Sequence, residues 1–273
     1  MEVPTKYHER AYLINEVCSF RKTREEFGGL SNMASGYPLK VNGITILSSE
    51  AIYQACRFPD FPEVQEKIIL QKSPMSAKMV GKPHKEKTRE DWDRVRIEVM
   101  YWCLRVKLAQ NFMTFGQLLE STNGKPIVEI SSKDQFWGTV KAKNSEHLIG
   151  INALGRLLMK LRQEYNSAKR FDLLCVEPVN ISNFVLLGEP IRIVDERQTF
   201  LRNLESHWKL INSYKSNLDV FSFKINKEYQ LYKTMAPSIQ VKEPKTTIKR
   251  PPKKTSKKSS RKSDTSQARL SLD

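Results

Sequence analysis

A short stretch of the chain combines a carboxylate, two aromatic rings and several glycines, which together could bind and cleave a heterocyclic substrate. Residues 134–138 read Asp-Gln-Phe-Trp-Gly, and residues 150–155 read Gly-Ile-Asn-Ala-Leu-Gly. Aromatic planes beside glycine backbone suit a flat heterocycle, and a nearby carboxylate can stabilise charge as a bond to it breaks. The alternative is a tight turn whose Phe136 and Trp137 fill the core, the commoner role of aromatic side chains.

The composition is that of a folded protein with a strongly basic C-terminal segment. Hydrophobic residues make up 39% of the 273, and the net charge is +16. Residues 236–273 carry 11 Lys/Arg against 3 Asp/Glu, a net charge of +8, with few apolar residues. This composition predicts a disordered tail. Binding of nucleic acid or nuclear import is expected of such a tail, and a solubilising extension is the alternative.

The sequence predicts neither a membrane protein nor a metalloprotein. No apolar run approaches the roughly 20 residues of a membrane helix, and residues 1–10 lack the apolar stretch of a signal peptide. The cysteines lie far apart and form no Cys-x-x-Cys pair, which indicates buried thiols in a reducing compartment: Cys18, Cys56, Cys103 and Cys175. We expect an intracellular, cytoplasmic protein, with a nuclear location as the alternative if the source is eukaryotic or viral, and with no metal, no cofactor and no membrane partner.

Turns and caps predict the elements that must position the candidate residues. Residues 12–20 alternate loosely and predict a strand, and Asn42-Gly43 predicts a β-hairpin over residues 37–47. Ser48 and Ser49 are good N-caps for a helix over residues 50–58. Ser73-Pro74 begins a short helix that Gly81 ends.

The clearest predicted helix spans residues 88–110. Thr88 and Asp91 resemble a capping box. An apolar stripe at helical spacing is expected to face the core, and it includes Trp92, Val95, Val99 and Val106. Further helices are predicted over residues 112–120, 152–165 and 196–216, and strands over residues 127–130, 173–176 and 185–194.

Polar side chains near two of the helix starts are candidates for a site. Glu50 and Gln54 share a face of the helix over residues 50–58, although an acid in a first turn commonly complements the helix dipole. Ser73-Pro74 leaves backbone N–H groups free at a helix start, which suits a phosphate. Lys72 and Lys78 would add positive charge there, and solvated surface lysines are the alternative.

The order of these elements resembles the YbiA/NADAR family over about residues 20–165. The matching segments are Leu30-Ser31-Asn32, residues 48–58 with Glu50 and Gln54, residues 73–81, residues 92–100, Lys107-Leu108-Ala109-Gln110-Asn111, Val128-Glu129, residues 134–138 and residues 150–159. The chain departs from the family pattern at Ala51, where the family often has His, and at Arg57, where it usually has Lys.

The resemblance implies an α+β fold, helix-rich around a small β-sheet, and hydrolysis of an N-glycosidic bond. We therefore expect a YbiA/NADAR-like domain over residues 12–165, an α/β extension over residues 166–235 and the basic tail over residues 236–273. The implied substrate is a phosphorylated ribose joined to a heterocyclic base, such as a phosphoribosylaminopyrimidine intermediate of riboflavin biosynthesis. The alternatives are removal of ADP-ribose from guanine in nucleic acid and non-catalytic binding of ADP-ribose or another nucleotide.

The resemblance also implies roles for individual residues. Glu50 is expected to be the leading catalytic carboxylate and Asp134 its partner. One would stabilise positive charge on the sugar and the other would protonate the leaving nitrogen or orient water, with the two roles interchangeable. Trp137 and Phe136 are expected to stack on the heterocycle. The other expected substrate contacts are Lys78 and Lys72 to phosphate, Gln54 and Asn152 to hydroxyls or the base edge, and Gly138.

Overall fold

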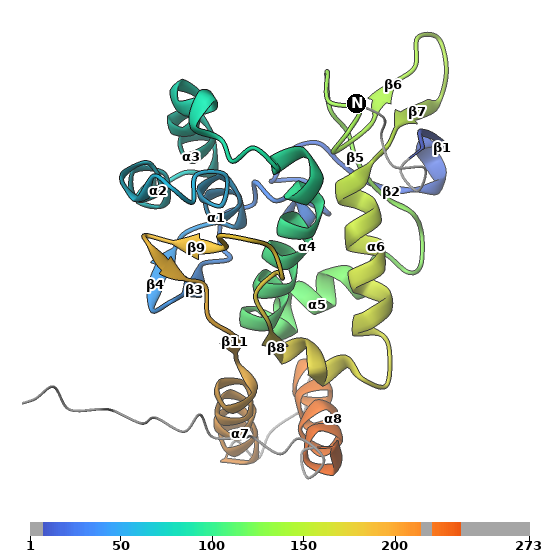
Figure 1. The fold of residues 1–273 in the computed structure, drawn as a ribbon. Helices are drawn as coiled ribbons and strands as arrows, with labels where there is room; N and C mark the ends of the chain where they lie inside the picture. Colours follow the sequence, from blue (N-terminus) through green and yellow to red (C-terminus); the bar gives the residue numbers. More distant parts are fainter. Residues whose placement is uncertain (1–7, 214–219, 236–273) are drawn as a thin grey trace, which may run out of the picture. The chain divides into compact units, whose positions relative to one another are not determined.

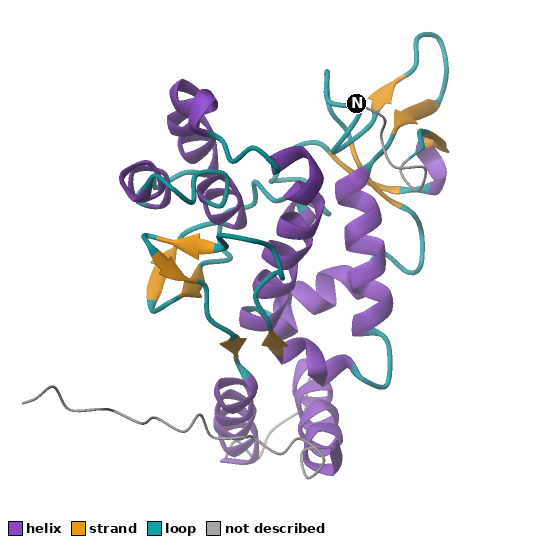
Figure 2. Cartoon of the chain, viewed as in Figure 1, coloured by secondary structure: helices purple, strands orange, loops and turns teal. Residues whose placement is uncertain are grey.

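Helices make up most of the fold, and the strands are short (Figure 2). The computed structural model describes residues 8–213 and 220–235. The helices are α1 (Ser49–Ala55), α2 (Pro62–Ile69), α3 (Pro74–Gly81), α4 (Trp92–Gln110), α5 (Phe112–Glu120), α6 (Ala153–Tyr165), α7 (Arg197–Ser213) and α8 (Val220–Met235), with 3-10 turns η2 (Ile14–Glu16), η3 (Gly28–Leu30), η4 (Lys82–Lys87) and η5 (Arg170–Leu174). The helix-rich α+β class is therefore confirmed.

The strands form several small sheets, whereas the sequence led us to expect one. The strands are β1 (Arg10–Leu13), β2 (Cys18–Phe20), β3 (Leu39–Val41), β4 (Ile44–Ile46), β5 (Ile127–Glu129), β6 (Val140–Lys141), β7 (His147–Gly150), β8 (Cys175–Val176), β9 (Val185–Leu186), β10 (Glu189–Pro190) and β11 (Val194–Asp195). β7 pairs antiparallel with both β1 and β6, and β2 pairs in parallel with β5. The remaining pairs are β3–β4, β8–β11 and β9–β10.

The predictions from turns are confirmed, but the prediction from loose alternation was wrong. β3 and β4 form the expected hairpin, in which Asn42 and Gly43 both have positive φ, 51° and 83°. Residues 12–20 are not one strand, because η2 separates β1 from β2 and the two join different sheets. Residues 185–194 are likewise divided, into β9, β10 and the start of β11.

Capping explains where α1 and α3 begin. Ser48 Oγ accepts a hydrogen bond from the backbone N–H of Ala51 (3.2 Å), and Ser73 Oγ accepts one from that of Ser76 (3.0 Å). α4 begins at Trp92, so the capping box predicted at Thr88 was wrong. The Asp91 carboxylate binds the Arg89 guanidinium instead of capping the helix.

α4 is the central helix of the core and packs against α1, α5 and α6 (Figure 1). Val95, Val99 and Val106 of its predicted stripe are buried, as expected. Trp92 is only half-buried and faces a pocket, so its assignment to the core was wrong. The surface of α4 near its beginning therefore forms part of a site.

Residues after α6 return to the helices that precede it. η5 and β8 pack on α4. Gln65 of α2 is fully buried; its Nε2 donates to the carbonyls of Ala55 and Val185, and its Oε1 accepts from the N–H of Leu187. The domain boundary at residue 165 stays a prediction. The predicted basic tail over residues 236–273 lies outside the described residues. Within the described residues, no helix is long and apolar enough to cross a membrane.

Candidate active site

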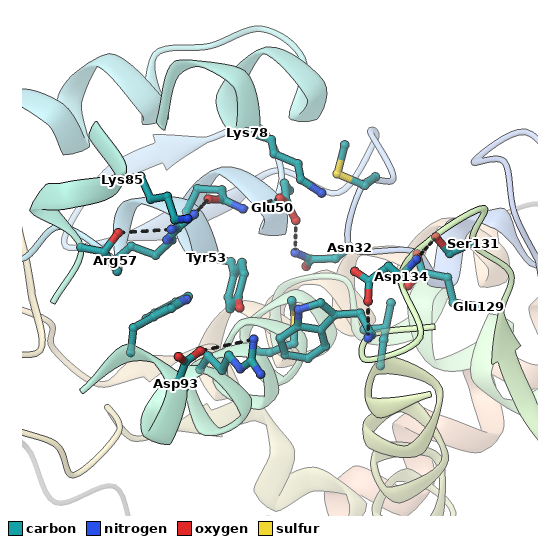
Figure 3. Close-up of a pocket in the computed structure, with 18 of the residues that line it drawn as sticks. Asn32, Glu50, Tyr53, Arg57, Lys78, Lys85, Asp93, Glu129, Ser131 and Asp134 are labelled. Carbon is teal, nitrogen blue, oxygen red and sulfur yellow. Dashed lines mark hydrogen bonds and ion pairs between the residues drawn. The ribbon is translucent and has the colours of Figure 1, made fainter. Parts of the chain in front are cut away.

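A cavity of about 820 Å³ opens between α1, α3, the start of α4 and the loop that follows β5 (Figure 3). Five of the residues predicted from the sequence line it: Glu50, Gln54, Lys78, Asp134 and Trp137. These residues are up to 87 positions apart in the chain, so the fold brings them together. A cavity of this size is in the range of ligand-binding pockets.

Glu50 lies in the first turn of α1 and is 5% exposed. Asn32 Nδ2 donates to one carboxylate oxygen, Oε2 (2.7 Å), and Gln54 Nε2 donates to the other, Oε1 (2.8 Å). The Asn32 carbonyl in turn accepts from the Glu50 N–H (3.2 Å) and from Ser49 Oγ (3.1 Å). The carboxylate is therefore held in one orientation by two amide groups.

Arg57 extends this network along the pocket wall. Its Nη1 donates to Gln54 Oε1 (3.0 Å), which leaves the Gln54 amide nitrogen directed at Glu50. Its Nη2 donates to Thr88 Oγ1 (3.2 Å), and its guanidinium lies 5.6 Å from the ring centre of Trp92. Arg57, which the sequence did not single out as a site residue, therefore fixes the donor that Glu50 needs.

Glu129, at the end of β5, is the acidic residue that the sequence reasoning missed. Its half-buried side chain lines the same cavity. Its pKa is raised from 4.5 to about 7, mainly by burial. The negative charges of Asp134 and Glu50 contribute to this rise, and the positive charge of Lys78 opposes it. A carboxyl group with this pKa can hold and release a proton at neutral pH. Only its place at the end of a buried strand, in the Val128-Glu129 match, could have drawn attention to it.

Asp134 is exposed at the pocket edge and organises the loop around it. Its Oδ1 accepts from the N–H groups of Phe136 and Trp137, both at 2.9 Å. Its own N–H donates to Ser131 Oγ (2.9 Å). One carboxylate oxygen thus fixes the turn that carries Trp137 towards the pocket.

Three aromatic rings form one wall of the cavity. Tyr53 packs edge-to-face on Trp137, with ring centres 5.7 Å apart, and lies 5.1 Å from Trp92. Phe136 does not line the cavity; it packs edge-on against Trp137, with the Arg96 guanidinium 3.8 Å from its ring centre. Phe136 therefore supports the ring that faces the cavity.

Three other predicted contact residues also lie outside the cavity lining. Lys72 is exposed beside α3. Asn152 is fully buried; its Nδ2 donates to the Ile127 carbonyl (2.9 Å) and its Oδ1 accepts from the Glu129 N–H (3.3 Å). Gly138 is buried where a Cβ atom would lie 2.6 Å from the Glu129 carbonyl oxygen. Asn152 and Gly138 thus hold the strand end that carries Glu129.

Cations that the sequence reasoning did not select also line the cavity, namely Arg21, Arg57, Lys85, Arg89 and Arg96. Arg89 is buried and its guanidinium donates to the carbonyls of Ser182 and Asn183 as well as to Asp91. Figure 3 shows Arg57 and Lys85 at one end of the cavity, and Glu129 and Ser131 at the other. Among the described residues, no three His, Cys, Asp or Glu side chains cluster as metal ligands would.

Comparison with known proteins gives a consistent picture. The chain is 34% identical over 148 residues to the N-glycosidase YbiA of Escherichia coli, covering 54% of this chain and 88% of that protein. It is 33% identical over 169 residues to the riboflavin biosynthesis protein VVA0006 of Vibrio vulnificus, covering 61% of this chain and 43% of that protein.

The NMR structure of E. coli YbiA, 34% identical, superposes with a TM-score of 0.46 and covers 54% of this chain and 83% of that one. The NADAR domain matches residues 19–166, more than half of the chain, and this span includes every residue that lines the cavity. This chain belongs to the NADAR family.

Proposed function

We propose that the chain hydrolyses an N-glycosidic bond between a phosphorylated ribose and a nitrogen of a heterocyclic base. The observation that carries the proposal is a pair of unlike carboxyl groups in one cavity. Glu50 is tied by two amide donors, whereas Glu129 has a pKa of about 7. The names of the relatives, an N-glycosidase and a riboflavin biosynthesis protein, support the same reaction class.

In this proposal, Glu50 stabilises the charge that develops on the sugar. Cleavage of the bond from C1′ to nitrogen leaves positive charge on the ribose ring, and a carboxylate placed close to it stabilises that transition state. The hydrogen bonds from Asn32 and Gln54 hold the Glu50 carboxylate before substrate binds. No reorientation is then needed as the charge develops.

Glu129 is proposed to supply the proton that the leaving group needs. The bond electrons move to the base nitrogen, which takes the proton from the Glu129 carboxyl group. A water oxygen then bonds to C1′, and the water proton passes to the Glu129 carboxylate, which restores the acid. A pKa near the working pH favours both transfers.

Asp134, expected from the sequence to be the direct partner of Glu50, is proposed to act through its neighbours. Its negative charge raises the pKa of Glu129 and so keeps that proton in place at neutral pH. Its Oδ1 also fixes the turn that presents Trp137. Both effects serve the same reaction without a proton transfer at Asp134.

The aromatic wall and the cations are proposed to bind the two ends of the substrate. Trp137 and Tyr53 would contact the heterocycle, and Lys78 would contact phosphate. Arg57 and Lys85 lie away from Glu129 (Figure 3), and could accommodate a second phosphate. That feature favours the second candidate, release of ADP-ribose from guanine, because ADP-ribose is longer and carries two phosphates.

Turnover by the Glu50→Gln variant tests the proposal. Purified wild-type protein and variant are each incubated with a phosphoribosylaminopyrimidine and, separately, with ADP-ribosylated DNA, and the released base or sugar is quantified. The variant should fold normally and lose more than nine-tenths of the rate, a barrier increase of at least about 1.4 kcal/mol. Glu66→Gln, at an exposed acid of α2, is the matched control and should keep the wild-type rate.

Two outcomes would contradict this function. A Glu50→Gln variant with more than a tenth of the wild-type rate would remove Glu50 from the mechanism. Tight binding of a nucleotide by the wild-type protein, without turnover of either substrate, would instead identify a non-catalytic binding module.

A further inference from the structure

Lys107 of α4 is a buried cation held without a carboxylate partner. Its side chain is 0% exposed, and Nζ donates to the carbonyls of Gly29 (2.7 Å) and Ser31 (3.1 Å). The rings of Tyr37 and Phe115 lie 4.3 Å and 4.4 Å from Nζ. In the part of the chain that the structure describes, no Asp or Glu forms an ion pair with it.

A buried ammonium group in this position costs folding free energy. Burial lowers the pKa of Lys107 from 10.5 to about 7, so the surroundings disfavour its charged form. Carbonyl oxygens and aromatic faces replace only part of the water that the ammonium loses. An apolar residue of similar length would fill the same space without that desolvation, so stability alone does not account for a lysine here.

The carbonyls that Lys107 binds belong to the turn that orients Glu50. Gly29 lies within η3, and Ser31 is the first residue after η3. Nζ therefore binds the carbonyl oxygens on both sides of Leu30. The next residue, Asn32, donates to Glu50 Oε2 and accepts from the Glu50 N–H. Lys107 itself does not line the cavity. Its ammonium group is connected to the site through this turn.

We propose that Lys107 is a positioning residue, whose ammonium group clamps residues 29–31 so that Asn32 holds the Glu50 carboxylate in its catalytic orientation. The inference rests on the proposed function of Glu50. It assigns no contact with substrate to Lys107. Loss of the clamp should therefore slow the chemical step and leave substrate binding by the aromatic and cationic walls almost unchanged.

The test compares kcat, KM and Tm for the Lys107→Met variant and the wild-type protein. We expect kcat to fall at least tenfold and KM to stay within about threefold. Tm should change little, because removal of the buried charge offsets the loss of the hydrogen bonds to the carbonyls of Gly29 and Ser31. Lys107→Gln, which can still donate to one carbonyl, should recover part of the lost kcat and carries the test if the methionine variant does not fold. Val106→Ala is the matched control at the adjacent buried position of α4, and should lower Tm with kcat within about twofold.

A double-mutant cycle with Asn32→Ala identifies the route of the effect. If Lys107 acts through Asn32, the double variant should be no slower than Asn32→Ala alone. Multiplied losses in kcat would overturn the proposal, and so would a wild-type kcat in Lys107→Met. A parallel fall of kcat and Tm with a raised KM would assign Lys107 to the fold alone. Failure of the proposed function is recognised separately, since Glu50→Gln would then retain activity.

Discussion

Replacement of Glu129 by Gln should change the pH dependence of stability, because its carboxyl group binds protons more tightly in the folded than in the unfolded chain. Its pKa is about 7 in the fold, against an ordinary value of 4.5. Between these two pH values the folded protein holds one proton more than the unfolded chain at this site. The wild-type protein therefore loses stability as the pH rises from about 4.5 to about 7.

The size of this effect follows from the two pKa values. At about 1.4 kcal/mol for each pH unit, the change from 4.5 to about 7 corresponds to about 3 kcal/mol. Glu129 is half-buried, and solvent screening reduces that figure to about 2 kcal/mol. Glutamine has nearly the same shape and no proton to lose. The variant should gain about this much over the wild-type protein at pH 8 relative to pH 4.5.

Urea denaturation at pH 4.5, 6 and 8 measures the difference directly. The free energy of unfolding of Glu129→Gln minus that of the wild type should grow steadily across this series. Glu66→Gln, on the exposed face of α2, should show no such trend. A Glu129→Gln difference that stays constant within about 0.5 kcal/mol would refute the raised pKa.

The same proton should govern catalysis. If Glu129 is the acid, kcat/KM of the wild-type protein should fall above about pH 7, tenfold for each further pH unit. Glu129→Gln should lose about 100-fold or more at pH 6 and lack this alkaline decline. A variant that keeps both the rate and the decline would show that another group supplies the proton.

Two further substitutions test neighbouring parts of the structure. Asp134→Asn removes a negative charge that raises the pKa of Glu129, so the alkaline decline of kcat/KM should move to lower pH; an unchanged pH profile would argue against this coupling. Gln65→Ala removes the three hydrogen bonds that this buried side chain makes, to Ala55, Val185 and Leu187, and should lower the free energy of unfolding by about 2 to 4 kcal/mol in urea denaturation. A loss below about 0.5 kcal/mol would mean that these bonds do not hold β9 and its turn in place.

Local signals in the sequence predicted the elements whose geometry depends on neighbouring residues. Ser48, Ser73 and the Asn42-Gly43 pair act within four residues, through caps and positive φ angles, and the corresponding helix starts and hairpin are confirmed. The strand predicted over residues 12–20 failed, because alternation alone does not show which partner strand is available. β1 pairs with β7 and β2 with β5, more than 100 residues away in the chain.

Site residues could be predicted where the residue type and its local motif indicate contact with a ligand. They could not be predicted where contacts with distant parts of the chain determine the role of the side chain. Glu129 is an ordinary glutamate in sequence, and its pKa depends on burial and on Asp134 and Glu50. Asn152 has the residue type of a ligand contact, but its left-handed backbone (φ 53°) and buried amide join α6 to β5. Lys107 lies beside apolar positions of α4, and only the folded turn shows its acceptors.

The segment beyond the family match also belongs to the architecture of the pocket, through Arg89. Its backbone N–H donates to the Arg57 carbonyl (2.9 Å), and its buried guanidinium donates to the carbonyls of Ser182 and Asn183. The NADAR match ends at residue 166, before these two carbonyls. A chain cut there would lose both of these acceptors, although Asp91 would still pair with the Arg89 guanidinium. We therefore infer that residues up to at least 183 help to hold the Arg57 end of the cavity, although none of them lines it.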